Sequence, residues 1–179
     1  AKCCLLLYKK ELLQKPPPCL QRLFFRHPGK MKMFLEENPS RSFDVENDYY
    51  LPEEAYQDKR AFDCWAECLY EEFPEILGYI MGKSCNGKDG AFPHEFIREF
   101  LEKQQNEKLT KAVFYGKFNS RGARIVQDGR TLYEQAKCYR AQARELRLKF
   151  PQSAKILLQL AKWMESEAQH DQLEAEIVP

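Results

Sequence analysis

The chain has 179 residues, 44% of them hydrophobic, which predicts a globular protein with one core. Its net charge of +1 gives no overall sign of a nucleic-acid-binding protein. The longest apolar run, residues 3–8, is too short for a membrane span or a secretory signal, so we expect no membrane association.

Charge is unevenly distributed along the chain. Residues 1–35 carry eight basic and one acidic side chain, a net +7, whereas residues 36–76 carry three basic and thirteen acidic ones, a net −10. A basic head beside an acidic block predicts either internal pairing or two opposite patches for partners.

The seven cysteines are odd in number and irregularly spaced. This pattern favours free thiols in a reducing cytoplasm over a disulfide framework. The sequence has no Cys-x-x-Cys pair, and its three histidines lie far apart. We therefore expect a cytoplasmic protein without a metal ion or another cofactor.

The first fifty residues predict a helical segment and a linker. Residues 1–15 have a helical pattern that three consecutive prolines end, and residues 20–25 add a helical turn. Residues 31–50 lack sustained periodicity and predict a linker, in which Met31-Lys32 is the most exposed-looking peptide. We divide the chain into a basic helical segment (1–30), the linker (31–50) and a helical domain (51–179). Because the chain lacks an initiator Met, we expect the first segment to end a missing upstream domain.

The middle of the chain predicts further helices. Pro52 and the acids after it predict the start of a helix that ends before Pro74, and a short helix follows over 76–81. Pro93 predicts the start of another helix. Residues 109–114 favour a helix, and residues 123–126 fit either a short strand or an extended loop.

Residues 82–90 form a glycine-rich loop that nearly matches the phosphate-binding pattern. Asp89 stands where a magnesium-binding hydroxyl is required, and its charge would repel phosphate. The loop also follows a helix, not a strand, so we predict a turn here. Spacing selects no Ser–His–acid or Cys–His set, and the acids of residues 58–75 face outward too regularly for an acid–base pair. The sequence therefore favours a protein that is not an enzyme.

The last fifty residues predict an antiparallel helix pair. Apolar residues in steps of four and three form one helical stripe at Leu132, Ala136, Tyr139, Ala143, Leu146 and Phe150. Pro151 stops this helix, and Ser153 can cap a second one. The second stripe consists of Ala154, Leu157, Ala161, Met164 and Ala168, which Leu158 and Trp163 widen. Recurring alanines predict close backbone approach, and the chain as a whole is predicted to be mostly α.

The outer face of the first helix of this pair carries a basic stripe, Lys137, Arg140, Arg144 and Arg147. This stripe is our candidate partner-binding site, for an acidic protein or for phosphates. A charged outer face is also the ordinary state of a surface helix, and Glu165, Glu167 and Asp171 on the returning helix would neutralise part of it.

Two family resemblances add to these patterns. The first resemblance rests on the segments Asn119-Ser120-Arg121-Gly122, Tyr139-Arg140-x-x-Ala143-x-x-Leu146-Arg147, Phe150-Pro151-x-Ser153-Ala154-x-x-Leu157, Leu160-Ala161 and Glu167-Ala168. They resemble a module at the ends of many uncharacterised bacterial proteins, which implies bacterial origin and no known activity.

The second resemblance rests on the basic head, the Met31-Lys32 peptide and the compact C-terminal helices. This organisation resembles the CRISPR-associated substrate protein that a caspase-like protease cuts in single-effector RNA-targeting systems. The resemblance implies a role in antiviral defence, a protease complex as partner and Met31-Lys32 as the processing site.

We therefore expect a non-enzymatic protein–protein interaction module that is the C-terminal part of a larger bacterial protein, with cleavage in the 26–40 region. The alternative is a nucleic-acid-binding helical domain that uses the basic stripe. Its binding would fall steeply with salt, because displaced counterions drive such binding. The acidic block of residues 36–76 argues against this alternative.

Overall fold

The computed structural model describes residues 16–39, 48–120 and 129–177. These residues form eight α-helices and one 3₁₀ helix, and no strand occurs among them. The helices are α2 (Pro18–Arg26), α3 (Pro28–Glu37), η2 (Glu53–Tyr56), α5 (Lys59–Tyr70), α6 (Pro74–Gly82), α7 (Glu95–Gln104), α8 (Glu107–Asn119), α9 (Arg130–Leu146) and α10 (Pro151–Ile177). The mostly-α prediction is confirmed. The helix predicted over 1–15 and the segment 123–126 lie outside the described residues.

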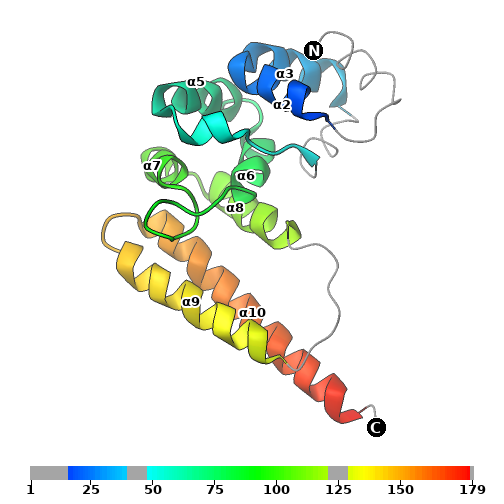
Figure 1. The fold of residues 1–179 in the computed structure, drawn as a ribbon, viewed down its shortest axis with the longest axis vertical. Helices are drawn as coiled ribbons and strands as arrows, with labels where there is room; N and C mark the ends of the chain where they lie inside the picture. Colours follow the sequence, from blue (N-terminus) through cyan, green and yellow to red (C-terminus); the bar gives the residue numbers. More distant parts are fainter. Residues whose placement is uncertain (1–15, 40–47, 121–128, 178–179) are drawn as a thin grey trace.

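The helices are arranged as two ends and a middle (Figure 1). Helices α2 and α3 lie at one end and pack on α5, and the long pair α9–α10 lies at the other end. Helices α6, α7 and α8 fill the middle, where both α7 and α8 contact α10. The helix pair therefore contacts the other helices chiefly through α10.

One main hydrophobic core runs through the molecule from α2 to α10. It contains Phe24 of α2, Met31 of α3, Trp65 of α5, Ile80 of α6 and Leu157 of α10, each fully buried. Because α2 and α3 share this core, the division into a separate segment at 1–30 and a domain that begins at 51 is wrong for residues 18–37.

The predicted linker at 31–50 is likewise wrong over its first seven residues. Residues 31–37 belong to α3, whose Met31, Phe34 and Leu35 side chains are buried. Lys32 forms an ion pair with Glu72. The prediction failed because the amphipathic pattern of this helix is short and the Asn-Pro-Ser sequence follows it directly. Residues 40–47 of the predicted linker lie outside the described residues.

The helix predicted after Pro52 is divided in two. The 3₁₀ turn η2 comes first, and α5 begins after Asp58, whose side chain accepts a hydrogen bond from the Ala61 amide at 3.0 Å. This is a standard N-cap, which satisfies an amide that has no partner within the helix. Prolines at the first turn of α2, α3 and α6 likewise begin helices without losing a hydrogen bond.

Glycines at the contact between helices α6 and α8 let the two backbones approach closely. A Cβ atom at Gly78 would lie 2.8 Å from the Leu109 carbonyl oxygen, and one at Gly82 would lie 2.7 Å from the Cα atom of Gly116. A Cβ atom at Gly116 would meet the backbone of Tyr79. The two backbones therefore touch with no side chain between them.

Helices α9 and α10 form the predicted antiparallel pair, with Ala143, Ala154 and Ala161 buried in or beside their interface. Pro151 is the first residue of α10, as the sequence predicts. The predicted cap at Ser153 is wrong, because Ser153 is buried and its hydroxyl makes no hydrogen bond with a described residue. Glu102 of α7 caps the helix instead by accepting from the Gln152 amide at 2.8 Å and the Ser153 amide at 3.3 Å.

Candidate interaction surface

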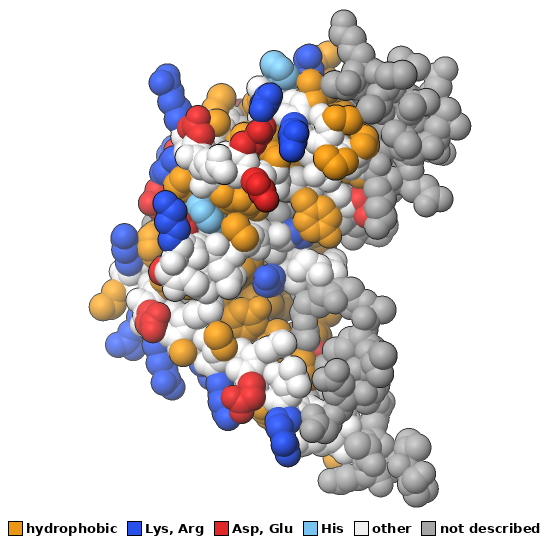
Figure 2. All heavy atoms as spheres, in the orientation of Figure 1, with side chains coloured by type: hydrophobic (Ala, Val, Ile, Leu, Met, Phe, Trp, Pro, Cys, Tyr) orange, Lys and Arg blue, Asp and Glu red, His pale blue; other side chains and the backbone are white. Residues whose placement is uncertain are grey.

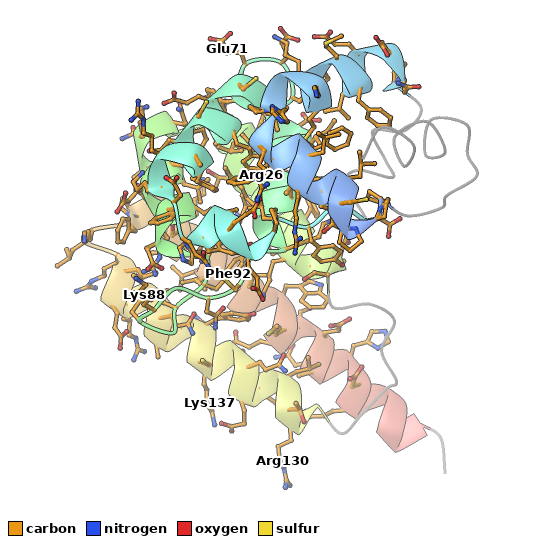
Figure 3. The ribbon with its side chains drawn as sticks, turned by 45° about the horizontal axis from the view of Figure 1, so that its top comes forward. Arg26, Glu71, Lys88, Phe92, Arg130 and Lys137 are labelled. Atoms are coloured by element: carbon orange, nitrogen blue, oxygen red, sulfur yellow. The ribbon has the colours of Figure 1, made fainter. Side chains whose placement is uncertain are left out.

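The structure divides the predicted basic stripe of α9 into two halves. In the first half, Lys137 pairs with Glu134 at 2.7 Å, and Arg140 forms two parallel hydrogen bonds with the Glu165 carboxylate. The hydrogen bonds from Arg140 lower the pKa of Glu165. Lys137 points away from the helix pair (Figure 3). The expected neutralisation of the stripe by α10 is thus met for Arg140.

The second half of the stripe is uncompensated. Arg144 and Arg147 are exposed, and neither forms an ion pair with a described residue. Arg147 borders a shallow hollow of about 380 Å³, which we name the basic hollow. It is lined by Arg147, Pro151, Ala154, Lys155, Leu158, Gln159 and Lys162.

Leu158 gives the basic hollow an apolar centre. Its exposed fraction of 46% shows that it does not widen the buried stripe of α10, so that prediction is wrong. Lys155 and Lys162 lie three residues before it and four residues after it, which places all three on one face of α10. This spacing was visible in the sequence, but the apolar step pattern assigned Leu158 to the core.

A second hollow, of about 330 Å³, adjoins the first between α8 and α10. We name it the aromatic hollow, since it is lined by Glu107, Thr110, Lys111, Phe114, Tyr115, Lys155 and Gln159. The Lys111 amine lies 6.0 Å from the centre of the Tyr115 ring, and Lys155 approaches Glu107 at 3.9 Å. The two hollows share Lys155 and Gln159, so they lie on either side of one ridge of α10.

The lining of the two hollows is strongly cationic. Four basic residues, Lys111, Arg147, Lys155 and Lys162, stand against one acid, Glu107, a net charge of +3. Figure 2 shows Lys and Arg side chains gathered along the helix pair, whereas both signs of charge are interspersed over the α2, α3 and α5 end. The helix pair is therefore the part of the described molecule best suited to an acidic partner.

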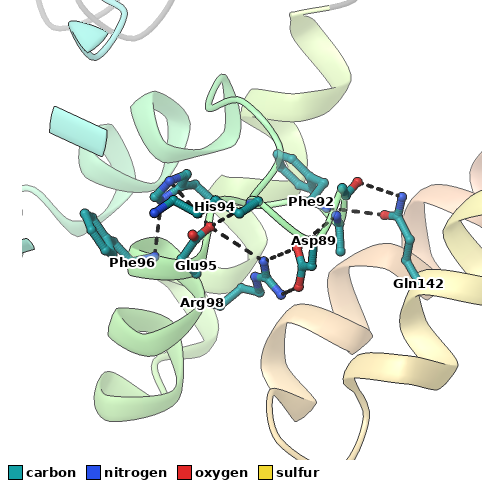
Figure 4. A network of polar contacts seen from close by, with 10 residues as sticks. Asp89, Phe92, His94, Glu95, Phe96, Arg98 and Gln142 are labelled. Atoms are coloured by element: carbon teal, nitrogen blue, oxygen red, sulfur yellow. Dashed lines mark hydrogen bonds and ion pairs between the residues drawn. The ribbon is translucent and has the colours of Figure 1, made fainter. Parts of the chain in front are cut away.

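The glycine-rich loop forms a structural joint, and its predicted turn is confirmed by the Gly90 amide donating to the Gly87 carbonyl at 2.9 Å. Both terminal nitrogens of Arg98 donate to the Asp89 carboxylate at 2.7 Å (Figure 4). These bonds lower the pKa of Asp89 to about 2. Gln142 of α9 then accepts from the Phe92 amide and donates to the Gly90 carbonyl, both at 3.3 Å. The loop therefore contacts α9, and its acidic residue Asp89 is paired with Arg98.

Burial shifts the pKa of His94 and Cys85 near this loop and of Cys68 on α5. Burial lowers the pKa of His94, which caps α7 by accepting from the Phe96 amide. Burial raises the pKa of the Cys68 and Cys85 thiols, which favours the less nucleophilic protonated form. Among the described residues, no three His, Cys, Asp or Glu side chains gather in a group that could hold a metal ion.

Met31 and Lys32 do not form an accessible peptide. Met31 is fully buried in the main core, and the bond between the two residues lies inside α3. A protease binds its substrate as an extended strand, so cleavage here would first require α3 to unfold. The expectation of an exposed processing site is therefore wrong.

None of the helices in the described ranges combines the length and the apolar character of a membrane span. Comparisons with known protein families, curated proteins and solved structures find no match for this chain. The two family resemblances therefore stay predictions that rest on the residues quoted for them.

Proposed function

We propose that this chain is a non-enzymatic protein–protein interaction module that docks a partner protein on the basic and aromatic hollows of α10. The observation that carries this proposal is the half-exposed Leu158 between Lys155 and Lys162, with Arg147 beside it. Interface centres typically combine an apolar anchor with a rim of charge that selects the partner.

A protein partner is favoured over nucleic acid by the chemistry of the hollow. Phosphate contacts need cations and amides but no apolar floor, whereas this floor is Pro151, Ala154 and Leu158. Two of the four stripe residues proposed for nucleic acid, Lys137 and Arg140, already pair with acids of the helix pair. Of the stripe itself, Arg144 and Arg147 remain for the nucleic-acid alternative.

The proposal does not include processing at Met31-Lys32, since that peptide is helical and Met31 is buried. Bacterial origin stays an expectation from the first resemblance. The thiols of Cys64, Cys68, Cys85 and Cys138 are unbridged, which fits the proposed reducing cytoplasm.

The test is affinity capture of the tagged chain from its native host after nuclease treatment, followed by mass spectrometry. We expect a stoichiometric protein partner with the wild type, and its loss with Leu158→Glu. Leu173→Glu is the matched control, because Leu173 lies on the same helix and is 61% exposed outside both hollows. Loss of every partner on nuclease treatment would instead support the nucleic-acid alternative.

A further inference from the structure

The two hollows of α10 are close enough for one short segment to occupy both. They lie on either side of the ridge made by Lys155 and Gln159, which line both of them. Because only this row of side chains separates them, the hollows lie no farther apart than about one helix diameter, roughly 10–12 Å. Two side chains on one face of a partner helix, separated by two turns, span about 10.5 Å. A partner helix can therefore place one anchor in each hollow.

The apolar lining of both hollows favours apolar anchors. Ala154 and Leu158 line the basic hollow, and Phe114 and Tyr115 line the aromatic hollow. Tyr115 is held in place by stacking on Tyr79, with the ring centres 6.4 Å apart. A firmly placed aromatic ring loses little conformational freedom on binding, which favours affinity.

The charged residues around the hollows indicate which side chains a partner would carry between and beside its apolar anchors. Lys155 stands on the ridge between the hollows, Lys111 borders the aromatic hollow, and Arg147 and Lys162 border the basic hollow. Arg147 and Lys162 have no ion-pair partner in the described part of the chain. Glu107 contacts Lys155 only at 3.9 Å, a distance beyond that of a hydrogen bond.

Resting on the proposed function, we infer that the partner presents an acidic amphipathic helix. Its apolar face carries two anchors two turns apart, one for the basic hollow and one for the aromatic hollow. Carboxylates between the anchors pair with Lys155, and carboxylates at the flanks pair with Lys111, Arg147 and Lys162. An amphipathic helix laid on a hydrophobic groove is a recurring mode of peptide recognition.

The experiment uses a fluorescent synthetic helix with leucines two turns apart and glutamates elsewhere on the same face. Binding to the full chain is followed by fluorescence anisotropy. We expect a dissociation constant of about 100 µM or tighter, weakened at least about tenfold by Leu158→Glu and unchanged by Leu173→Glu. Thermal melts of both variants, which change only exposed leucines, verify that the chain stays folded.

Two matched peptides distinguish the contribution of charge to binding from the contribution of apolar contact. A peptide with glutamine for every glutamate should bind more weakly, and added salt should weaken the acidic peptide more than the neutral one, because salt screens exposed charges. Equal binding of the two peptides would overturn the assigned charge, and equal binding by Leu158→Glu and Leu173→Glu would overturn the assigned site. Tighter binding of a single-stranded oligonucleotide of equal charge would overturn the inference in favour of nucleic acid.

The two tests can fail separately. If affinity capture yields a nuclease-resistant partner that Leu158→Glu loses while the acidic peptide does not bind, the interaction module stands and the partner chemistry is wrong. If neither capture nor peptide binding depends on Leu158, the proposed function itself is wrong.

Discussion

Helices α6–α8 and α9–α10 are two close-packed pairs built on different small residues. In α9–α10, alanines such as Ala143 and Ala161 bring the helices together while each still fills space with a methyl group. In α6–α8, Gly78, Gly82 and Gly116 let backbone meet backbone. In the glycine pair, an added side-chain atom would therefore meet backbone, whereas in the alanine pair the helices already pack through side chains.

Gly82→Ala tests this difference with the largest expected effect. The new methyl group would meet the Val113 carbonyl oxygen and lie 2.7 Å from the Lys117 amide nitrogen, so the helices must separate. We expect unfolding to become easier by about 3 kcal/mol, at the upper end of overpacking effects. Chemical denaturation followed by circular dichroism measures this change.

The control is Gly29→Ala in α3, where a Cβ atom would meet no atom within 4 Å. Alanine favours a helix over glycine, so this variant should be about 0.5–1 kcal/mol more stable. A similar stabilisation by Gly82→Ala would show that the two helices can separate freely, and would remove the contrast between the pairs.

Ala161→Leu likewise overpacks the contact between α9 and α10. Ala161 is fully buried, and the larger side chain should destabilise the chain by about 1–3 kcal/mol. In a protein of this size that corresponds to a fall in melting temperature of roughly 2–4 °C per kcal/mol. An unchanged melting temperature would contradict close packing of α9 on α10.

Asp89→Asn weakens the glycine-rich loop before α7. This loop contacts α9 and so connects the α9–α10 pair to the α6–α8 pair. Arg98 is 1% exposed and its Nε makes no hydrogen bond with a described residue, so loss of the Asp89 charge leaves this buried cation with only Glu95, 3.9 Å away, as an ion-pair partner in the described part of the chain. Because the Asp89 side chain is 53% exposed, water offsets part of the loss, and we expect about 1.5 kcal/mol.

The same joint gives the wild type a pH dependence. The pKa of Asp89 lies at about 2 in the folded chain against an ordinary value of 3.8. Its stabilising contribution is therefore fully present above about pH 4 and is lost as the pH falls towards 2. The stability difference between wild type and Asp89→Asn should shrink over this window. A difference that stays constant from pH 5 to pH 2 would contradict the ion pair.

Arg140→Ala should have the smallest effect. Its bonds to Glu165 join α9 and α10 on the surface, where water screens the charges, so we expect at most about 0.5 kcal/mol. A loss comparable to that of Ala161→Leu would mean that charge, and not the alanine seam, holds this pair together. Lys137→Ala, which removes the exposed pair with Glu134 within α9, is the control.

The sequence predicted the alanine pair well and the glycine pair poorly, for one physical reason. Alanine is a good helix former, so its recurrence leaves the helical pattern intact. The sequence instead predicts a loop from Gly82 onward and no packing role for Gly116, because glycine ordinarily signals a turn. Only the presence of a second backbone shows that a glycine serves packing.

The candidate site was predicted in part. The sequence predicts Arg147, which does border the basic hollow, but it does not predict Lys155 and Lys162, because they lie on the second helix of the pair and no local pattern joins them to Arg147. Which acid neutralises Arg140 depends on the register of two helices, and local periodicity does not determine that register. Met31 was misplaced since its burial depends on contacts with distant residues such as those of α5.

Helix α10 is longer than its partner, with 27 residues against 17 in α9. At about 1.5 Å per residue these lengths are about 40 and 25 Å. Gly129, at the start of α9, packs against Ala168, so the turns after Ala168 extend beyond α9. Amide hydrogens in the first turns of α10 should exchange with solvent only on global unfolding, whereas those beyond Asp171, which is still buried, should exchange by local fraying. A single continuous helix would thus show two opening free energies.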